Sequence, residues 1–403
     1  MTSFPQADFS WSQKGAPARL LEVLNAHGEA RFVGGCVRDS LLGLPPGPSG
    51  RTDIDIAAAL LPGKIMDILA AAGIRHVPTG IDHGTVTAII DHTPFEITTL
   101  RADIETDGRR AVVAFTEEWQ GDAARRDFTI NALYLSSAGE VVDYHEGQSD
   151  LEGRRVRFIG QAEDRIREDY LRILRFLRFS ARYADRFDQA GWTACMRLSE
   201  GIEALSRERI WSETAKLFSA PGAPDAFAAA ADSDVLARIC PSEADTERFS
   251  ILHALRQGDI APALGLAALW PAAVRQEIQR AFKPSLAILD DMEAVKAAST
   301  RIDTQASPLE ILYFYRRDIA LWAADLRLAV TGDAIDTADL SILKGATKPV
   351  LPLKGADFVR RGLPKGPRIG AALKHFESRW IATGFPEDQE TIDRLASEAV
   401  SAA

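Results

Sequence analysis

The stretch DIDIAA, residues 53–58, places two aspartates two positions apart in an otherwise apolar segment. This pattern predicts a β-strand, and because side chains alternate along a strand, Asp53 and Asp55 are expected to point the same way. Two carboxylates at this spacing repel each other, and one is driven toward protonation unless a positive group lies between them. The identity of the positive group that offsets the repulsion between Asp53 and Asp55 is therefore the first question that the sequence raises.

Two glycines precede the strand by one helix and one loop. In RFVGGCVRDSLLG, residues 31–43, Gly34 and Gly35 lie where a predicted strand turns into a predicted helix. Glycine lets backbone amides approach an anion at such a turn, and the start of a helix favours negative charge. Arg38 lies one turn into the helix, within reach of a phosphate or a ribose. A tight strand–helix turn would by itself explain the glycines, but their spacing from the two aspartates favours a phosphate site.

Paired carboxylates beside a phosphate site are typical of a magnesium centre. Mg²⁺ binds oxygen ligands and keeps nucleotide phosphates as further ligands, and two ions can clamp the attacking and leaving oxygens of an in-line displacement. We therefore expect Asp53 and Asp55 to hold Mg²⁺ with a nucleoside triphosphate. Glu96 in FEITTLR, residues 95–101, is the candidate third carboxylate on a neighbouring strand. Solvated carboxylates on a polar edge strand are the alternative.

A second polar segment, RRDFTINAL at residues 125–133, is unusually rich in polar groups for the helix that it is expected to form. Arg126 and Asn131 are placed to face a triphosphate or a ribose, and Asp127 lies between them. The alternative is a surface helix with local ion pairs.

The stretch EDYLRILRFLRFSAR, residues 168–182, predicts a helix with two faces. Its arginines fall at spacings of three, three and four and form one stripe, while its leucines form an apolar stripe toward a core. Asp169 lies three residues before Arg172, so a carboxylate and a guanidinium are expected side by side. Such a pair matches the amino group and ring nitrogen of cytosine and adenine, whereas uracil and guanine would leave a group unpaired, at about 1–3 kcal/mol per contact. Arg175 and Arg178 are candidates for phosphate. An ordinary intrahelical ion pair is the alternative.

Length and composition indicate an ordinary globular protein of several domains. The 403 residues carry a net charge of −10, which argues against a generally basic nucleic-acid binder. The arginines are nevertheless concentrated, with thirteen and no lysine between Arg154 and Arg209. An ion-paired helical face would also explain them. The three cysteines match neither a metal nor a disulfide pattern and no segment is long and apolar enough to span a bilayer, so we expect a reduced, cytoplasmic protein without a membrane association.

Strand and helix signals alternate over the first 150 residues and predict an α/β domain with a mixed sheet. Within it, residues 84–91 and 94–101 predict a hairpin, and the charged segment 102–112 predicts a long loop. After residue 147 the pattern becomes helical to the end of the chain, with possible boundaries near residues 221 and 300.

The motifs GGCVRDSLLG, DIDIA, HGTVTAII, FEITTLR, RRDFTINAL and EDYLRILRFLRF, in this order, resemble those of class II CCA-adding tRNA nucleotidyltransferases, whose superfamily includes the bacterial poly(A) polymerases. The resemblance is close over residues 31–182. It continues more weakly through LSRERIWSETAKL at 205–217 and through residues 351–373. Single motifs of this kind are weak evidence, but six in the same order are specific.

The resemblance implies an α+β fold in which a polymerase-β-like nucleotidyltransferase head (1–146) is followed by an all-helical neck (147–220), body (221–300) and tail (301–403). It implies that Asp53 and Asp55 bind catalytic Mg²⁺ and that Glu96 completes the catalytic carboxylates. The residues expected to bind nucleotide are Gly34, Gly35, Arg38, Arg126, Asp127, Asn131, Asp169, Arg172, Arg175 and Arg178. Segment 102–115 corresponds to the family's flexible head loop, which favours addition of the full CCA rather than CC alone.

The function implied is template-independent addition of C, C and A to a tRNA 3′ end from CTP and ATP, with release of pyrophosphate and no protein partner. A poly(A) polymerase acting on RNA 3′ ends is the nearest alternative. A catalytically silent RNA-binding protein is disfavoured because both strand aspartates are present. A small-molecule nucleotidyltransferase is disfavoured because the long arginine-bearing helical part favours a larger acceptor.

Overall fold

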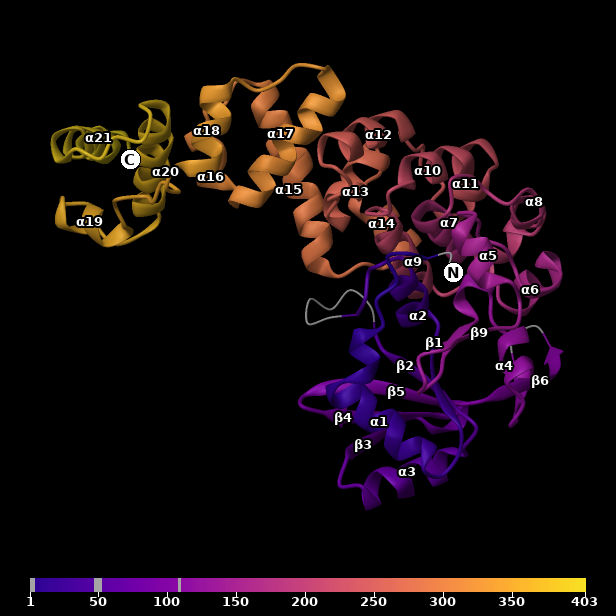
Figure 1. Ribbon diagram of the computed structural model, residues 1–403. Helices are drawn as coiled ribbons and strands as arrows, with labels where there is room; N and C mark the ends of the chain where they lie inside the picture. Colours follow the sequence, from indigo (N-terminus) through magenta and orange to yellow (C-terminus); the bar gives the residue numbers. More distant parts are fainter. Residues whose placement is uncertain (1–3, 47–52, 108–109) are drawn as a thin grey trace. The chain divides into compact units, whose positions relative to one another are not determined.

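The computed structural model describes residues 4–46, 53–107 and 110–403. The chain forms two compact units, Met1–Pro241 and Ser242–Ala403. All described strands lie in the first unit, before residue 144, and the described chain beyond them is helical (Figure 1). The predicted α+β class is thereby confirmed. The division of the chain at residues 146, 220 and 300 stays a prediction.

A seven-stranded mixed sheet organises the first unit, in the order β3-β4-β5-β2-β1-β8-β9. Strand β2 is parallel to β5, and the other neighbouring strands are antiparallel. Because β2 is the central strand, the residues at its start have a neighbouring strand on each side. The bounds are β1 Ala30–Val33, β2 Asp55–Ala58, β3 Arg75–Gly80, β4 Thr85–Ile90, β5 Thr93–Thr99, β8 Leu133–Leu135 and β9 Val141–Asp143.

The hairpin predicted before residue 101 is confirmed, since β4 and β5 pair antiparallel from Thr85 opposite Thr98 to Ile90 opposite Thr93. The loop predicted for 102–112 is wrong in part. Strands β6 (Arg101–Asp107) and β7 (Arg110–Phe115) form a separate two-stranded sheet, and residues 108–109 between them lie outside the described residues. The missed signal is the run AVVAF at 111–115, whose valines and phenylalanine favour a strand despite the charges around them.

Helices pack on the sheet and hold the turn between β1 and α2 in place. Helices α1 and α3 pack against each other, α1 also contacts β1, and α3 contacts β3 and β4. The short helix α2 follows β1 directly and contacts β1 and β8, so the turn between them is held against the sheet. The bounds are α1 Gly15–Asn25, α2 Gly35–Leu41, α3 Pro62–Ala71 and α4 Trp119–Ala124, with 3₁₀ turns at Ser10–Gln13 and Ile81–His83.

The helix predicted over residues 125–133 is wrong. Helix α4 ends at Ala124, Phe128 forms a β-bridge with Phe158, a 3₁₀ turn covers Thr129–Asn131, and β8 begins at Leu133. Aromatic packing explains the difference, because the centre of the Phe128 ring lies 4.9 Å from that of Phe158 and 5.4 Å from that of Phe179 in α7 (Leu171–Tyr183). Tertiary contacts of this size outweigh a local helical preference.

The predicted amphipathic helix of 168–182 exists but begins later than expected. Helix α6 ends at Glu168, Asp169 has extended backbone angles, and α7 covers Leu171–Tyr183. The apolar stripe is confirmed, because Leu171, Leu174, Leu177 and Ala181 are all buried. Helix α7 packs against α9 and α10. The remaining bounds in this unit are α5 Gly147–Glu152, α6 Ala162–Glu168, α8 Gln189–Arg197, the 3₁₀ turn Ser199–Ala204, α9 Arg207–Leu217, α10 Ala223–Asp232 and α11 Val235–Ile239.

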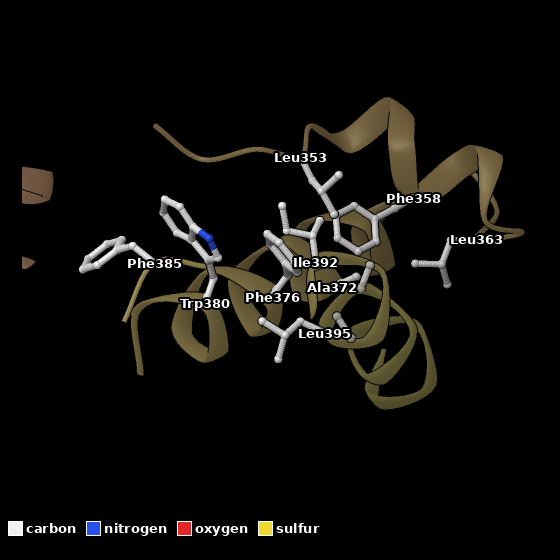
Figure 2. Packing of buried hydrophobic residues seen from close by; sticks show 11 residues of the cluster. Leu353, Phe358, Leu363, Ala372, Phe376, Trp380, Phe385, Ile392 and Leu395 are labelled. Carbon is white, nitrogen blue, oxygen red and sulfur yellow. The ribbon is translucent and has the colours of Figure 1, made fainter. Parts of the chain in front are cut away.

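The second unit consists of helices around separate apolar clusters. Buried side chains of α16, α17 and α18 form one cluster, which includes Ile311, Leu312 and Leu343. Those of α19 to α21 form another, in which Trp380, Phe376 and Phe358 lie between the helices (Figure 2). The bounds are α12 Thr246–Leu255, α13 Pro262–Leu269, α14 Arg275–Phe282, α15 Leu286–Asp303, α16 Pro308–Phe314, α17 Arg317–Thr331, α18 Thr337–Gly345, α19 Gly355–Arg360, α20 Pro367–Ala382 and α21 Gln389–Ala402.

Across the described ranges of the chain, we find no helix with both the length and the apolar character needed to cross a membrane.

Candidate active site

The turn between β1 and α2 has the geometry expected of an anion cradle. Gly34 has a φ of 76°, a conformation that L side chains rarely adopt, and Gly35 begins α2. A Cβ atom built on Gly34 would lie 3.7 Å from the carbonyl oxygen of Asn131 and 3.8 Å from Nη1 of Arg126. The turn therefore faces the two residues that the sequence predicted to share its ligand, and one of them presents a cation to it.

The start of β2 brings two of the three predicted carboxylates together. Asp55 is the first residue of β2, and its backbone is paired with Val33, just before the glycine turn, and with Glu96 on β5. Glu96 is exposed while its neighbours in β5, Phe95 and Ile97, are buried, as strand alternation predicts. One sheet edge thus carries the glycine turn, Asp55 and Glu96.

Asp53 lies outside the strand, contrary to the prediction that both aspartates share it. It is exposed and precedes β2 by two residues. Its charge nevertheless reaches Asp55, because burial, the carboxylate of Glu96 and that of Asp53 together raise the pKa of Asp55 to about 6, against the opposing effect of Arg126. Asp53, Asp55 and Glu96 therefore form an acidic cluster, in which negative charge exceeds the positive charge supplied by Arg126.

This donor set fits a divalent cation whose shell is completed by another group. Among the residues that the structure describes, no three His, Cys, Asp or Glu side chains converge closely enough to form a ready-made metal site. The raised pKa of Asp55 reflects repulsion between neighbouring carboxylates, and a bound cation would reduce that repulsion. Oxygen ligands of this kind suit Mg²⁺, which is usually held by one or two carboxylates plus substrate phosphates.

Arg126 is held in place by a buried acid that the sequence did not identify. Asp122, which is 1% exposed, accepts hydrogen bonds from Arg126 Nε at 3.2 Å and from the hydroxyl of Tyr134 at 2.9 Å. Burial disfavours the charged form of Arg126, but Asp122 and Tyr134 more than offset this and raise its pKa. Arg126 is therefore a fixed cation aimed at the glycine turn.

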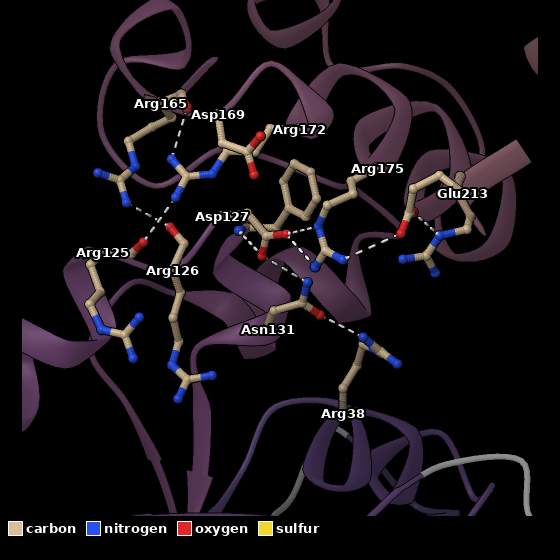
Figure 3. A network of polar contacts seen from close by, with 12 residues as sticks. Arg38, Arg125, Arg126, Asp127, Asn131, Arg165, Asp169, Arg172, Arg175 and Glu213 are labelled. Atoms are coloured by element: carbon tan, nitrogen blue, oxygen red, sulfur yellow. Dashed lines mark hydrogen bonds and ion pairs between the residues drawn. The ribbon is translucent and has the colours of Figure 1, made fainter. Parts of the chain in front are cut away.

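Two further predicted residues, Asp127 and Asn131, are buried and face each other (Figure 3). Asn131 Nδ2 donates to Asp127 Oδ1 at 3.0 Å, and Arg175 Nε donates to Asp127 Oδ2 at 2.7 Å. Burial by itself would raise the pKa of Asp127, but the guanidinium of Arg175 and the amide of Asn131 hold it below its ordinary value. Arg38 donates to Asn131 Oδ1 and is itself only 6% exposed.

Asp169 and Arg172 are not paired with each other, contrary to the expected intrahelical pair. Asp169 Oδ1 accepts from the backbone N–H of Leu171 at 3.1 Å, and its Oδ2 accepts from Arg209 at 2.7 Å. Because Asp169 lies in the break between α6 and α7, its side chain does not follow the stripe of α7. The acid and the arginine therefore have separate partners.

Arg172 is anchored by main-chain and carboxylate acceptors. Its Nη1 donates to the carbonyl of Arg165 at 2.8 Å and to the carboxylate of Glu168, and its Nη2 donates to the carbonyl of Arg125 at 3.3 Å (Figure 3). Helix α7 is thus linked through Arg172 to the residue that precedes Arg126.

Arg175 and Arg178 share a buried acid on α9. Glu213, which is 5% exposed, accepts from Nε of Arg178 and lies 3.8 Å from Nη1 of Arg175 (Figure 3). Together with Asp127 it balances both guanidinium charges, so that neither arginine is a free cation in this structure. Glu213 lies in the segment 205–217, on the side of α9 that also buries Ile210 and Leu217. The only sequence signal for it is an acid at helical spacing from these apolar residues.

Comparison with known proteins shows which family shares this region of the chain. The model of the family described as "Poly A polymerase head domain" matches residues 30–157, which contain the glycine turn, the carboxylates and Arg126. The crystal structure of the Bacillus stearothermophilus CCA-adding enzyme in complex with CTP superposes with a TM-score of 0.74 at 27% identity, over 95% of this chain and 97% of that one.

Curated relatives match over nearly the whole chain. The mitochondrial CCA tRNA nucleotidyltransferase 1 of Homo sapiens is 33% identical over 378 residues, which cover 90% of this chain and 85% of the relative. The CCA-adding enzyme of Streptococcus gordonii is 33% identical over 390 residues, which cover 93% of this chain and 94% of the relative. The chain therefore belongs to the family of CCA-adding tRNA nucleotidyltransferases.

Proposed function

We propose that this protein adds C, C and A in succession to the 3′ end of tRNA, taking CTP and ATP as substrates and releasing pyrophosphate. The observation that carries the proposal is the placement of the glycine turn, Asp55, Glu96 and Arg126 at one sheet edge, in a chain whose relatives over nearly its full length are CCA-adding enzymes. No nucleic-acid template is required, because protein side chains contact the base.

In the reaction the 3′-hydroxyl oxygen of the tRNA forms a bond to the α-phosphorus of the nucleotide. The bond between that phosphorus and the oxygen that bridges it to the β-phosphorus breaks, this oxygen leaves with the bonding electron pair as part of pyrophosphate, and the hydroxyl proton passes to water. Asp53 and Asp55, with Glu96 as the third carboxylate, would hold Mg²⁺, which supplies charge neutralisation of the phosphates and activation of the attacking oxygen. The carboxylates also keep the attacking hydroxyl and the α-phosphate in line.

The triphosphate would lie along the turn of Gly34 and Gly35. Backbone amides there accept close approach of an anion, and Arg126 presents its Nη1 to the same place. Arg38 and Asn131 border the turn from the side of α2, through the hydrogen bond between them. These residues bind and orient the nucleotide and need not distinguish one base from another.

Base selection would use Asp169 and Arg172. In the structure both side chains have other partners, so binding a base means exchanging the contact of Asp169 with Arg209 for one with the amino group of cytosine or adenine. Arg172 offers donors to the ring nitrogen next to that amino group. Asp127, Arg175 and Arg178 belong to the same nucleotide-binding region, where Glu213 balances the last two.

The remaining features are part of the same proposal. Segment 102–115, which supplies β6 and β7, would be the family's head loop and favours addition of the complete CCA. Residues 147–220, 221–300 and 301–403 would serve as neck, body and tail, with the tail binding tRNA. We infer a cytoplasmic protein that needs no protein partner, and its three cysteines are free and buried, as a reducing compartment permits.

A product-length assay tests the proposed function. Purified protein is incubated with Mg²⁺ and a tRNA that ends at its discriminator base, with each labelled nucleotide alone and with CTP plus ATP. We expect two additions from CTP alone and a third only when ATP is present. Long ladders from ATP alone would identify a poly(A) polymerase, the nearest alternative because it shares this kind of head. Binding of tRNA without any incorporation would leave a silent RNA-binding protein.

Magnesium binding is expected to weaken as the pH falls below about 6. The carboxyl group of Asp55 has a pKa raised to about 6, so that below this pH a proton competes with the cation for it. The apparent affinity should then fall by about tenfold per pH unit. Calorimetric titration of Mg²⁺ at a series of pH values checks this, with Asp55→Asn as the variant that should lose the step. An affinity that does not change through this range would contradict the assignment.

A further inference from the structure

Helix α2, which carries the glycine turn, and helix α7, which carries the base-selecting arginine, are joined at two separate points. One point begins at Arg38 and the other at Asp39, and both lie in the first unit of the chain. The hydrogen bonds and the backbone of α7 together form a closed ring, which we call the α2–α7 circuit. Its members are Arg38, Asp39, Asn131, Asp127, Arg175 and Tyr183.

The outer point joins Asp39 to Tyr183, the last residue of α7. The Tyr183 hydroxyl donates to Asp39 Oδ1 at 2.9 Å, and the same oxygen accepts from Arg38 Nε at 2.8 Å. Asp39 is 3% exposed and Tyr183 is 5% exposed, and the guanidinium of Arg38 lies 4.2 Å from the centre of the Tyr183 ring. The contact joins residues 144 positions apart in the sequence.

The inner point runs from Arg38 through Asn131 and Asp127 to Arg175. Each link is a hydrogen bond between side chains, and the link between Asp127 and Arg175 is also an ion pair. Arg175 and Tyr183 are eight residues apart in α7, about 12 Å along the helix axis. Core packing already limits the rotation of α7, and attachment to α2 at two points two turns apart constrains its rotation and its height relative to α2 more tightly than attachment at one point.

This geometry bears on base selection because Arg172 lies one turn before Arg175 on the same side of α7. The distance from the glycine turn to Arg172 therefore depends on how α7 is attached to α2. A nucleotide whose phosphates lie at the turn meets the base-selecting side chains only if that distance is held. A buried polar network whose members are all hydrogen-bonded makes the elements that it joins more rigid.

We propose that Asp39 and Tyr183 are positioning residues that hold the base-selecting part of α7 at a defined distance from the phosphate-binding turn. They act through Arg38 and α7 and touch neither the nucleotide nor the metal. The inference rests on the function proposed above, and it adds two residues to which no nucleotide contact is assigned.

Tyr183→Phe tests the outer point with little change in packing, because the ring stays beneath Arg38 and only the hydroxyl is lost. The variant loses the hydrogen bond donated to Asp39 and the one that the hydroxyl accepts from Arg182 Nε at 3.0 Å, and only the first joins α7 to α2. We expect kcat for CTP and ATP to fall by about tenfold and the preference for CTP over UTP to fall by a similar factor, the effect of losing that bond to a charged acceptor. KM for CTP should change by less than about threefold, since the glycine turn and Arg126 are intact. The melting temperature, measured alongside, reports any general loss of stability.

Tyr144→Phe is the matched control. Its hydroxyl accepts from Nη1 of Arg31 at 3.1 Å, which matches the hydrogen bond that Tyr183 accepts from Arg182, and this contact has no link to α7. It should leave kcat and selection within about twofold of the unchanged protein. Asp39→Asn should resemble Tyr183→Phe, and the double variant should be no worse than the more affected single one, because both changes break the same point.

The outcomes separate the inference from the proposed function. A lower melting temperature with unchanged kcat and unchanged selection would make the circuit purely structural and overturn the inference. Absence of any incorporation by the unchanged protein would instead overturn the proposed function. In that case equilibrium binding of labelled CTP and UTP still decides the inference, because a preference that is present in the unchanged protein and equally strong in Tyr183→Phe would contradict it.

Discussion

Asp55→Asn is expected to lower nucleotide incorporation by about a thousandfold or more. Asp55 is the first residue of the central strand β2, between the end of β1 and Glu96 of β5, so no other side chain can replace it at this position. An amide is neutral and binds a hard cation weakly, and loss of metal-assisted charge stabilisation of several kcal/mol corresponds to this factor in rate. Single-turnover incorporation of labelled CTP into tRNA measures the effect.

The control for this variant is Asp91→Asn in the turn between β4 and β5. Asp91 is exposed and has a φ of 50°, a conformation that asparagine adopts as readily as aspartate. Its incorporation rate should equal that of the unchanged protein. If Asp55→Asn retained more than about a tenth of the activity, Asp55 would not be a ligand of the catalytic metal.

Asp55→Asn is expected to lower activity without lowering the stability of the fold. Because the folded state raises the pKa of Asp55 to about 6, the charged carboxylate is disfavoured there, and its contribution to stability is present below the ordinary pKa and is lost as the pH rises through about 6. Without metal at neutral pH, Asp55→Asn should therefore be at least as stable as the unchanged protein. Urea unfolding at pH 5 and pH 7.5 distinguishes this from a general folding defect.

Asp169→Ala is expected to relax the choice of base while leaving most of the chemistry. The carboxylate is the proposed acceptor for the amino group of cytosine or adenine, and its removal takes away a contact that uracil and guanine cannot make. The preference for CTP over UTP should fall by about ten- to a hundredfold, as expected for one lost contact of 1–3 kcal/mol. Measurement of kcat/KM for all four nucleotides checks this.

Asp169→Ala also removes an ion pair with Arg209, so its control variant must lose an ion pair as well. Asp164→Ala is a suitable control, since Asp164 lies in the first turn of α6 and its ion pair with Arg167 is exposed. It should leave the four kcat/KM values unchanged. An equal loss of incorporation for all four nucleotides in Asp169→Ala would show that Asp169 supports the fold of this region and does not select the base.

Local sequence patterns were sufficient for the parts of the site that lie on consecutive residues or on a regular strand. Asp53 precedes β2 and does not share the strand, but the turn at the paired glycines, the place of Asp55 in β2 and the exposed Glu96 each follow from alternation or from backbone conformation, and β2 and β5 are indeed neighbours. These predictions succeeded because the physical constraint, such as a positive φ at Gly34 or one buried face of β5, acts within a few residues.

Two predictions failed where distant contacts override local preference. Residues 125–133 do not form a helix because Phe128 packs against Phe158 and α7, and Asp169 lies outside α7 because the helix begins at Leu171. In both cases a local pattern was compatible with a helix, and the energy of packing or of a different hydrogen bond decided otherwise.

The sequence by itself determined the α+β order, the glycine turn, the strand that begins at Asp55 and the family, because these depend on residue type, periodicity and the order of motifs. Only the tertiary structure decided which polar side chains are partners. These are Asp122 with Arg126, Glu213 with Arg178, Arg209 with Asp169, and Tyr183 with Asp39. Most of these partners are 35 or more positions apart, in a chain where many acids and arginines compete. Periodicity specifies the face on which a side chain lies, but the partner across that face is set by how separate elements pack.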